Sequence, residues 1–175
     1  MAPSQRSPLD WNYTPGQIEA ETKQLIAQKK AFLDRIAAIP LEEAAFDNVV
    51  KPMGELGNDT CAQYSVIVFL QHVSPDKALR DASTQAEKEL QEFDIECSMR
   101  RDVFRVVDAV FKSTDRSQLS PEDRRYLEKI HLSYTRDGLA LPDDQLEKLK
   151  GLRKRLADLS IEFSRNVNEA DVELL

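Results

Sequence analysis

Apolar residues recur at gaps of three and four over two long stretches of the chain, residues 79–111 and 149–167. This spacing places them on one face of an α-helix. No stretch of useful length alternates between apolar and polar residues, which is the pattern of a half-buried strand. The pattern therefore predicts an all-α fold of about five to six helices, with long antiparallel helices packed as a bundle-like lobe.

The predicted helices share a start signal, a proline near the first helical position. The four starts are Thr14-Pro15, Ser74-Pro75, Ser120-Pro121 and Pro142. Gln17 follows Thr14 by three positions, which completes a capping box. Pro40 ends the first helix, and Gly138 ends the helix that starts at Ser120.

Residues 1–13 contain two prolines among mixed polar residues, and they predict an N-terminal arm that Trp11 and Tyr13 attach to the core. Residues 14–175 predict one helical domain, because this length buries a sizeable core and the sequence contains no repeat of 20 to 50 residues.

Residues 41–73 give a less regular pattern. Gly54 and Gly57 interrupt the middle, and residues 58–60 (Asn-Asp-Thr) are expected to end one helix and start another. Residues 64–70 are apolar and partly β-branched, so a helix and a strand are both compatible with them. The helical surroundings and the lack of partner strands favour a helix.

The stretch from Ser74 to Ser113 contains no evident helix breaker after its start. One continuous helix there would hold about 38 residues and extend roughly 57 Å. It would need a long neighbour to cover its stripe, and the helix predicted at 142–168 is long enough to pair with it. We expect both stripes to lie in an intramolecular core, including that of the last helix: Leu149, Leu152, Leu156, Leu159, Phe163 and Val167.

The composition changes the picture in three ways. A net charge of −7 argues against nucleic acid as a partner, because phosphate binding needs a basic field. The longest apolar run, residues 66–70, is too short to cross a membrane. The first eleven residues resemble neither a signal peptide nor a transit peptide. Cys61 and Cys97 show no disulfide or metal spacing pattern, which favours reduced thiols, and a single bridge between them is the alternative. A cytoplasmic protein with reduced thiols is expected.

The search for catalytic chemistry gives only weak candidates. The two histidines, His72 and His131, do not form the H-E-x-x-H zinc motif. Glu128 and His131 form a single E-x-x-H, whereas di-iron bundles need two. His131 is interpreted as a histidine beside the core and His72 as a residue at a helix end. The sequence therefore predicts no catalytic, cofactor-binding or metal-binding residue in this chain.

A basic run lies on the last helix, at Lys148, Lys150, Arg153, Lys154 and Arg155. Such a run binds an acidic partner or a membrane surface in some proteins. It is more often a solvated helix face paired with nearby acids, and here Glu147, Asp143 and Asp144 are the expected partners.

Several blocks of the sequence resemble one family, the thimet oligopeptidase, neurolysin and saccharolysin group of zinc peptidases, with fungal saccharolysin-like members nearest in wording. The blocks occur in family order from Asp10 onward: residues 14–40, 46–50 (FDNVV), 71–75 (QHVSP), 80–84 (RDAST), 92–93, 98–100, 136–142 (RDGLALP) and 161–169 (IEFSRNVNE). Gly54, Gly57 and Cys61 lie in a stretch that varies among relatives, so no function is placed there.

The resemblance implies the N-terminal helical segment of a zinc-dependent endopeptidase that cuts short peptides in a deep channel. The zinc motif and the catalytic Glu of such enzymes lie beyond the matched region, so zinc is expected in a catalytic domain that this chain lacks. The implied partners are the remainder of the peptidase chain and, in the full enzyme, short peptides. The expected role is a wall of the channel.

The alternative is a stand-alone helical module that binds another protein through its stripes and has no enzymatic activity. The last residues, Leu174 and Leu175, are apolar, whereas a finished domain usually closes with a cap or a polar tail. This ending favours a cut fragment or a truncated gene product, and a complete protein is the alternative.

Overall fold

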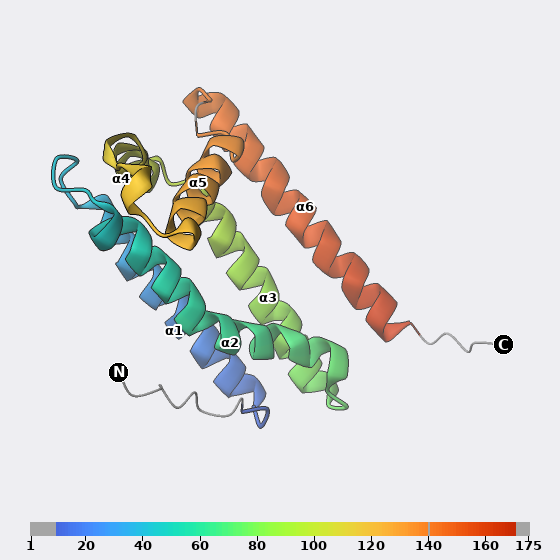
Figure 1. Cartoon of the computed structure of the whole chain (residues 1–175). Coiled ribbons are helices and arrows are strands. Elements are labelled where there is room, and N and C mark those ends of the chain that lie inside the picture. The colour runs from blue at the N-terminus through green and yellow to red at the C-terminus, as the bar shows by residue number, and fades with distance from the viewer. Residues whose placement is uncertain (1–9, 140, 171–175) are drawn as a thin grey trace.

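A computed structural model describes residues 10–139 and 141–170 (Figure 1). The predicted all-α class is confirmed, because the described residues form helices and connecting turns without strands. The elements are α1 (Pro15–Ala37), the π-helical turn η1 (Phe46–Val50), α2 (Lys51–Val73), α3 (Lys77–Ser98), α4 (Arg101–Ser113), the 3₁₀ turn η2 (Arg116–Gln118), α5 (Pro121–Arg136) and α6 (Asp143–Glu169).

The caps predicted at Thr14 and Ser120 start α1 and α5. The start predicted at Ser74-Pro75 is wrong, because Ser74 ends α2 and α3 begins at Lys77 with Asp76 as its cap. At the start of α1, the Gln17 backbone N–H donates to Thr14 Oγ1 at 3.3 Å, and the Thr14 N–H donates to Gln17 Oε1 at 2.9 Å. At the end of α5, Gly138 has a φ of +90°, a backbone conformation that residues with a side chain rarely adopt. A Cβ at Gly138 would also lie 2.8 Å from Leu149 and 3.0 Å from Leu141.

The break predicted at residues 58–60 is wrong, because α2 continues unbroken through it. Thr60 does not cap a new helix, since its Oγ1 donates to the Leu56 carbonyl at 2.8 Å within α2. Gly54 allows α2 to approach α5 closely, because a Cβ at this position would lie 3.1 Å from the Tyr126 ring of α5. At Gly54, packing therefore outweighs the cost of a glycine to helix stability, about 1 kcal/mol.

The continuous helix predicted for residues 74–113 is also wrong, because it divides at Met99 and Arg100 into α3 and α4. At about 100° per residue, Cys97 and Val103 would lie some 120° apart on one straight helix, yet both are buried. The break turns the α4 valines toward the core. Arg100 is extended, and it is held by ion pairs to Asp34 at 2.5 Å and Asp102 at 2.6 Å.

The helices α1, α2 and α3 form the body of the molecule, with α4 and α5 across one end (Figure 1). The two hydrophobic clusters occupy different parts of this body. The smaller one joins α1, α2 and α3 through Ile18, Leu25, Ile67, Leu70, Ala86 and Leu90. The larger one joins α1, η1, α4 and α5 and includes Val49, Val50, Val103, Val107 and Leu127, which are fully buried.

Helix α6 pairs with α3, as predicted, and extends along its outer side in the opposite direction (Figure 1). Its start is fastened to α4, because the Arg101 side chain donates to the Leu141 carbonyl and pairs with Asp143. Each described helix is too short or too polar to span a lipid bilayer.

The predicted arm lies only partly within the described residues, which begin at Asp10, and the predicted ending at Leu174 and Leu175 lies outside them. The Trp11 ring meets the edge of Phe69 with centroids 6.1 Å apart, and the Tyr13 hydroxyl donates to Glu21 at 3.0 Å. These contacts attach residues 10–13 to the first and second helices.

Ser83 is a buried polar residue that joins α3 to α2. Its Oγ donates to the Ile67 carbonyl at 2.6 Å and accepts from the Gln71 N–H at 2.9 Å. Replacing Ser83 with Ala removes both bonds and leaves a small void, so the free energy of unfolding should fall by about 1–3 kcal/mol. Ser160→Ala, at an exposed site of α6, is the matched control and should change stability by less than about 0.5 kcal/mol in urea denaturation. Equal midpoints for the two variants would contradict the assignment.

Candidate functional site

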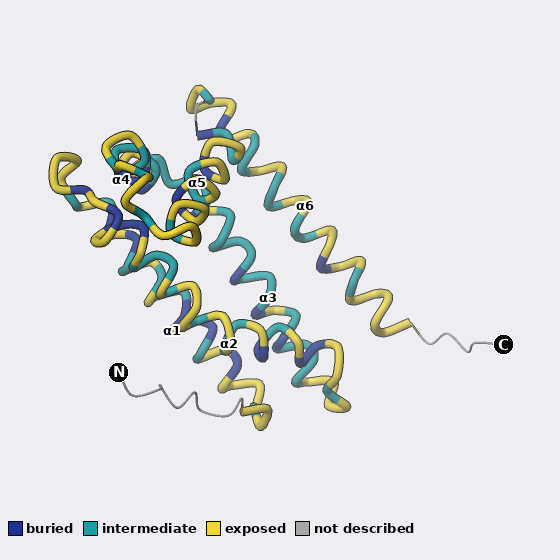
Figure 2. Tube along the Cα trace, in the orientation of Figure 1, coloured by how far each residue is buried: buried dark blue, intermediate teal, exposed yellow. Residues whose placement is uncertain are grey.

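The most unusual surface of the described molecule is the outer stripe of α6. It consists of five large apolar side chains with high exposed fractions: Leu152 61%, Leu156 66%, Leu159 44%, Phe163 70% and Val167 58%. The expectation that this stripe lies in the core is wrong. Figure 2 shows most of α6 as exposed, and Leu146 and Ile161 are its buried residues.

The opposite side of α6 explains this exposure, because it faces α3 through charges. Four ion pairs link the two helices in antiparallel register: Lys154–Glu96 at 2.7 Å, Asp158–Lys88 at 3.3 Å, Arg165–Asp81 at 3.1 Å and Glu169–Lys77 at 3.9 Å. The charged positions of α6 are displaced by two residues, about 200°, from the outer stripe. Pairing the charges therefore turns the stripe away from α3.

The inner side of α3 is already occupied. Its apolar residues Ala86 and Leu90 pack with α1 and α2 in the smaller cluster, and Ser83 is bonded to α2. Only the charged side of α3 remains for α6. Among the described residues, no element covers the outer stripe.

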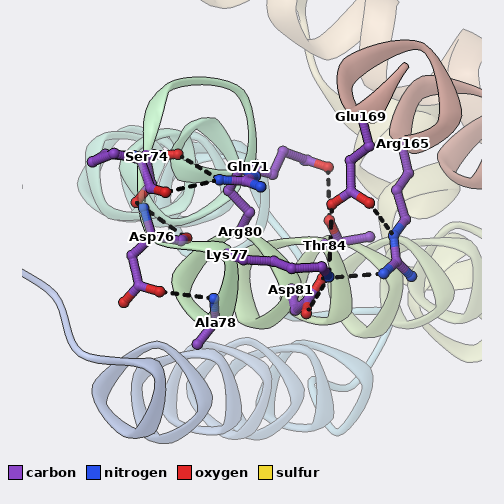
Figure 3. Close-up of polar contacts among 11 residues, drawn as sticks. Gln71, Ser74, Asp76, Lys77, Ala78, Arg80, Asp81, Thr84, Arg165 and Glu169 are labelled. Atoms are coloured by element: carbon purple, nitrogen blue, oxygen red, sulfur yellow. Dashed lines mark hydrogen bonds and ion pairs between the residues drawn. The ribbon is translucent and has the colours of Figure 1, made fainter. Parts of the chain in front are cut away.

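The far end of α6 meets the start of α3 in a ring of four charges (Figure 3). Arg165 lies between Asp81 and Glu169, and Lys77 lies 2.8 Å from Asp81. The hydrogen bond from Lys77 lowers the pKa of Asp81, and the nearby charge of Arg165 lowers it further.

The turn before this ring is also fixed. Asp76 caps α3 by accepting from the Ala78 N–H at 2.9 Å, and Arg80 donates to the carbonyls of Ser74 and Pro75 at 3.1 Å each (Figure 3). The ring thus connects α6 to a rigid corner of the body.

The candidate histidines lie in separate places. His72 is in the last turn of α2, as predicted, and its Nδ1 lies 2.8 Å from Asn168 Nδ2. His131 stacks on Phe111 with centroids 3.9 Å apart, and its Nε2 lies 3.0 Å from Asp108. Burial alone would raise the pKa of Asp108, but hydrogen bonds from Lys112 and His131 outweigh it and lower the pKa.

The E-x-x-H fragment does not assemble around a shared point, because Glu128 pairs with Arg124 at 3.1 Å while His131 bonds Asp108. Within residues 10–139 and 141–170, no three His, Cys, Asp or Glu side chains gather as metal ligands would. That this chain supplies no catalytic, cofactor-binding or metal-binding residue stays a prediction.

Two residues of the basic run of α6 are paired with acids, but not with those expected. Arg153 contacts Asp137 at 2.8 Å, and Lys154 contacts Glu96. Of the acids named from the sequence, Asp143 pairs with Arg101 of α4. These basic residues therefore pair with acids outside α6 and not with acids along α6 itself.

Comparisons with known proteins connect these features to a family, although no protein-family model matches the chain. Saccharolysin of Saccharomyces cerevisiae is 31% identical over 166 residues, which cover 94% of this chain and 23% of saccharolysin. The chain matches a segment of the saccharolysin and thimet oligopeptidase family.

Two further relatives agree. The thimet-like oligopeptidase of Dictyostelium discoideum is 30% identical over 90% of this chain, and the probable thimet oligopeptidase of Arabidopsis thaliana is 27% identical over 90%. The chain spans about a quarter of the length of the curated relatives it matches, 22–24% of these three. This saccharolysin-like segment is therefore much shorter than its relatives.

The sequence contained one overlooked signal for the exposed stripe. Charges at positions 77, 81, 88 and 96 have opposite charges in reverse order at 169, 165, 158 and 154. Two helices with such spacing pair through their charged sides, and the apolar side of the later helix then faces outward.

Disrupting the outer stripe should change association without unfolding the chain. Leu156→Lys with Phe163→Glu removes apolar surface that is already exposed, so the thermal midpoint should stay within about 2 °C while concentration-dependent association and dye binding fall. Sedimentation and fluorescence of a hydrophobic dye measure this. The control is Glu162→Lys, a charge change at an exposed position of α6 outside the stripe. A large loss of stability would mean that the stripe packs within the chain.

The α3–α6 contact should weaken in acid and in salt. The hydrogen bond from Lys154 of α6 lowers the pKa of Glu96. The pKa of Asp81 is lowered by Lys77 within α3 and by the charge of Arg165 from α6. The Lys154–Glu96 and Arg165–Asp81 pairs therefore stabilise the contact above the ordinary carboxyl pKa, near 4. The contribution disappears as pH falls through the lowered values. The methyl resonances of Ile161 should shift below about pH 4, and also in 1 M salt at pH 7.

Ile67, fully buried between α2 and its neighbours, is the internal control for this titration. Its methyl resonances should hold their positions over the range in which those of Ile161 move. Parallel changes at Ile161 and Ile67 would instead indicate global unfolding and would contradict a local electrostatic contact.

Proposed function

We propose that this chain is the N-terminal helical segment of a zinc-dependent oligopeptidase, in which it forms a wall of the channel that admits short peptides. The observation that carries the proposal is the outer stripe of α6, on a chain that matches only about a quarter of the length of oligopeptidase relatives. A helix that exposes five large apolar residues needs a partner to cover them.

The remainder of the peptidase chain is the proposed partner. The stripe spans 16 residues from Leu152 to Val167, which is about 22 Å of helix. The other helices cannot supply the cover, because their apolar faces are used in the two core clusters. A surface of this length and character fits a permanent interface within one protein better than a transient one.

In this function the segment contributes to the shape of the channel and supplies no reacting group. The zinc ion and the groups that activate water are proposed to belong to the catalytic part of the longer protein, and the wall restricts entry to short, unfolded peptides. A cytoplasmic location is proposed with it. The free thiols of Cys61 and Cys97 are compatible with that compartment.

The same stripe supports a second candidate, a stand-alone helical module that binds another protein. An amphipathic helix held only by ion pairs on its other side is a suitable recognition element. The two candidates differ in the size of the native protein, since the module would be a protein of 19.9 kDa.

The deciding experiment is the intact mass of the native protein, captured from source cells with an antibody to α6 and assayed on a short fluorogenic peptide. The expected result is a species several times heavier than 19.9 kDa whose cleavage is lost on chelation and restored by Zn²⁺. The purified 175-residue chain, as control, should not cleave the peptide. A native species near 19.9 kDa, or chelator-sensitive cleavage by the short chain itself, would contradict the proposal.

A further inference from the structure

A cavity of about 310 Å³ lies between α1, α2, α3 and α5, apart from the α3–α6 contact. Its walls are largely apolar: Phe32 and Leu33 come from α1, Met53 and Leu56 from α2, and Ile130 from α5. An engineered apolar cavity of about half this volume holds benzene, and ligand pockets begin near 300 Å³. The space is therefore large enough for a ring with a short substituent.

The charges around the cavity are already neutralised. Lys29 and Asp94 pair with each other, and Asp137 is held by Arg153 at 2.8 Å. An ionic ligand would have to break one of these pairs. The cavity consequently favours a neutral molecule.

Of the cavity-lining hydroxyl groups for which no hydrogen bond is found, that of Tyr134 belongs to a buried residue, whereas Tyr126 and Ser133 are exposed. The Tyr134 side chain lines the cavity and the residue is only 7% exposed, yet no hydrogen bond of its hydroxyl is found among the described residues. Burial raises the pKa of Tyr134, so the hydroxyl keeps its proton at neutral pH and can donate it. The hydroxyl is not among the fully buried polar atoms that lack a partner, so it is open to the cavity, where a ligand acceptor can replace water.

We propose that this cavity binds a small neutral aromatic molecule that carries one hydrogen-bond acceptor, which the Tyr134 hydroxyl contacts. The apolar walls bury the ring and Tyr134 fixes its orientation. Cys97, also 7% exposed, lines the same space, and burial raises the pKa of its thiol to about 11, so the thiol remains neutral. This inference does not depend on the proposed function.

Two probes test the chemistry: acetophenone, which has a ring and a carbonyl acceptor, and ethylbenzene, which lacks the acceptor. Amide resonances of the 175-residue chain are followed during titration with each probe. Saturable shifts around the cavity are expected for both, with acetophenone bound about five-fold more tightly, the size of one modest hydrogen bond. Absence of saturable shifts with both probes would overturn the proposal.

Tyr134→Phe removes the hydroxyl and keeps the ring, so the fold should tolerate it. The expected result is that the preference for acetophenone disappears while the affinity for ethylbenzene is unchanged. If the variant still binds acetophenone five-fold more tightly than ethylbenzene, Tyr134 does not contact the ligand.

Gly57→Leu tests the location. Gly57 lies on the α2 face that includes Met53 and Thr60, and a Cβ there meets no atom within 4 Å. The leucine should enter the cavity and weaken both probes at least ten-fold. Gly151→Leu is the control, because it is also an open helical glycine but lies in α6 outside the cavity. Equal binding by the two variants would contradict the assignment.

The two cysteines give an independent readout in the unmodified chain. Acetophenone should slow the maleimide labelling of Cys97 and leave that of the exposed Cys61 unchanged. Equal rates for Cys97 with and without the probe would place any binding elsewhere.

Discussion

The organisation of this protein depends on α3, a single helix whose two sides have opposite chemistry. One side packs Ala86 and Leu90 against α1 and α2 and places the Ser83 hydroxyl on the α2 backbone. The other side is charged. Whatever lies on that second side must be matched by charge, and α6 satisfies this requirement only by turning its apolar residues outward.

The two sides of α3 also differ in strength. A large apolar side chain buried on the inner side, such as Leu90, contributes about 1.5–3 kcal/mol, whereas an exposed ion pair contributes about 0–1 kcal/mol and is screened by salt. The α1–α2–α3 body is therefore the rigid part of the molecule, and α6 is the part with the weakest attachment. In a longer protein, the free energy from covering the outer stripe of α6 would exceed that of its contact with α3.

The features that the sequence predicted correctly are those with local causes. The capping box of Thr14 and Gln17 and the turn at Gly138 need only a few neighbouring residues. The break at Met99 and Arg100 was missed because it arises from the angle between two buried faces, which only the packed core defines. The exposure of Phe163 was missed for the same reason: periodicity identifies an apolar face, but not whether another element covers it. The Tyr134 cavity has no sequence signal, since four separate helices form it.

The orientation of α6 is set at its first residues, where it follows α5. Helix α6 has 27 residues and is about 40 Å long, so a rotation of 10° at Gly138 would move its far end by about 7 Å. That displacement exceeds the reach of any ion pair in the ring around Arg165. The close approach of Leu149 and Leu141 to Gly138, together with the Arg101 contacts, thus controls at one end whether charges at the other end can meet.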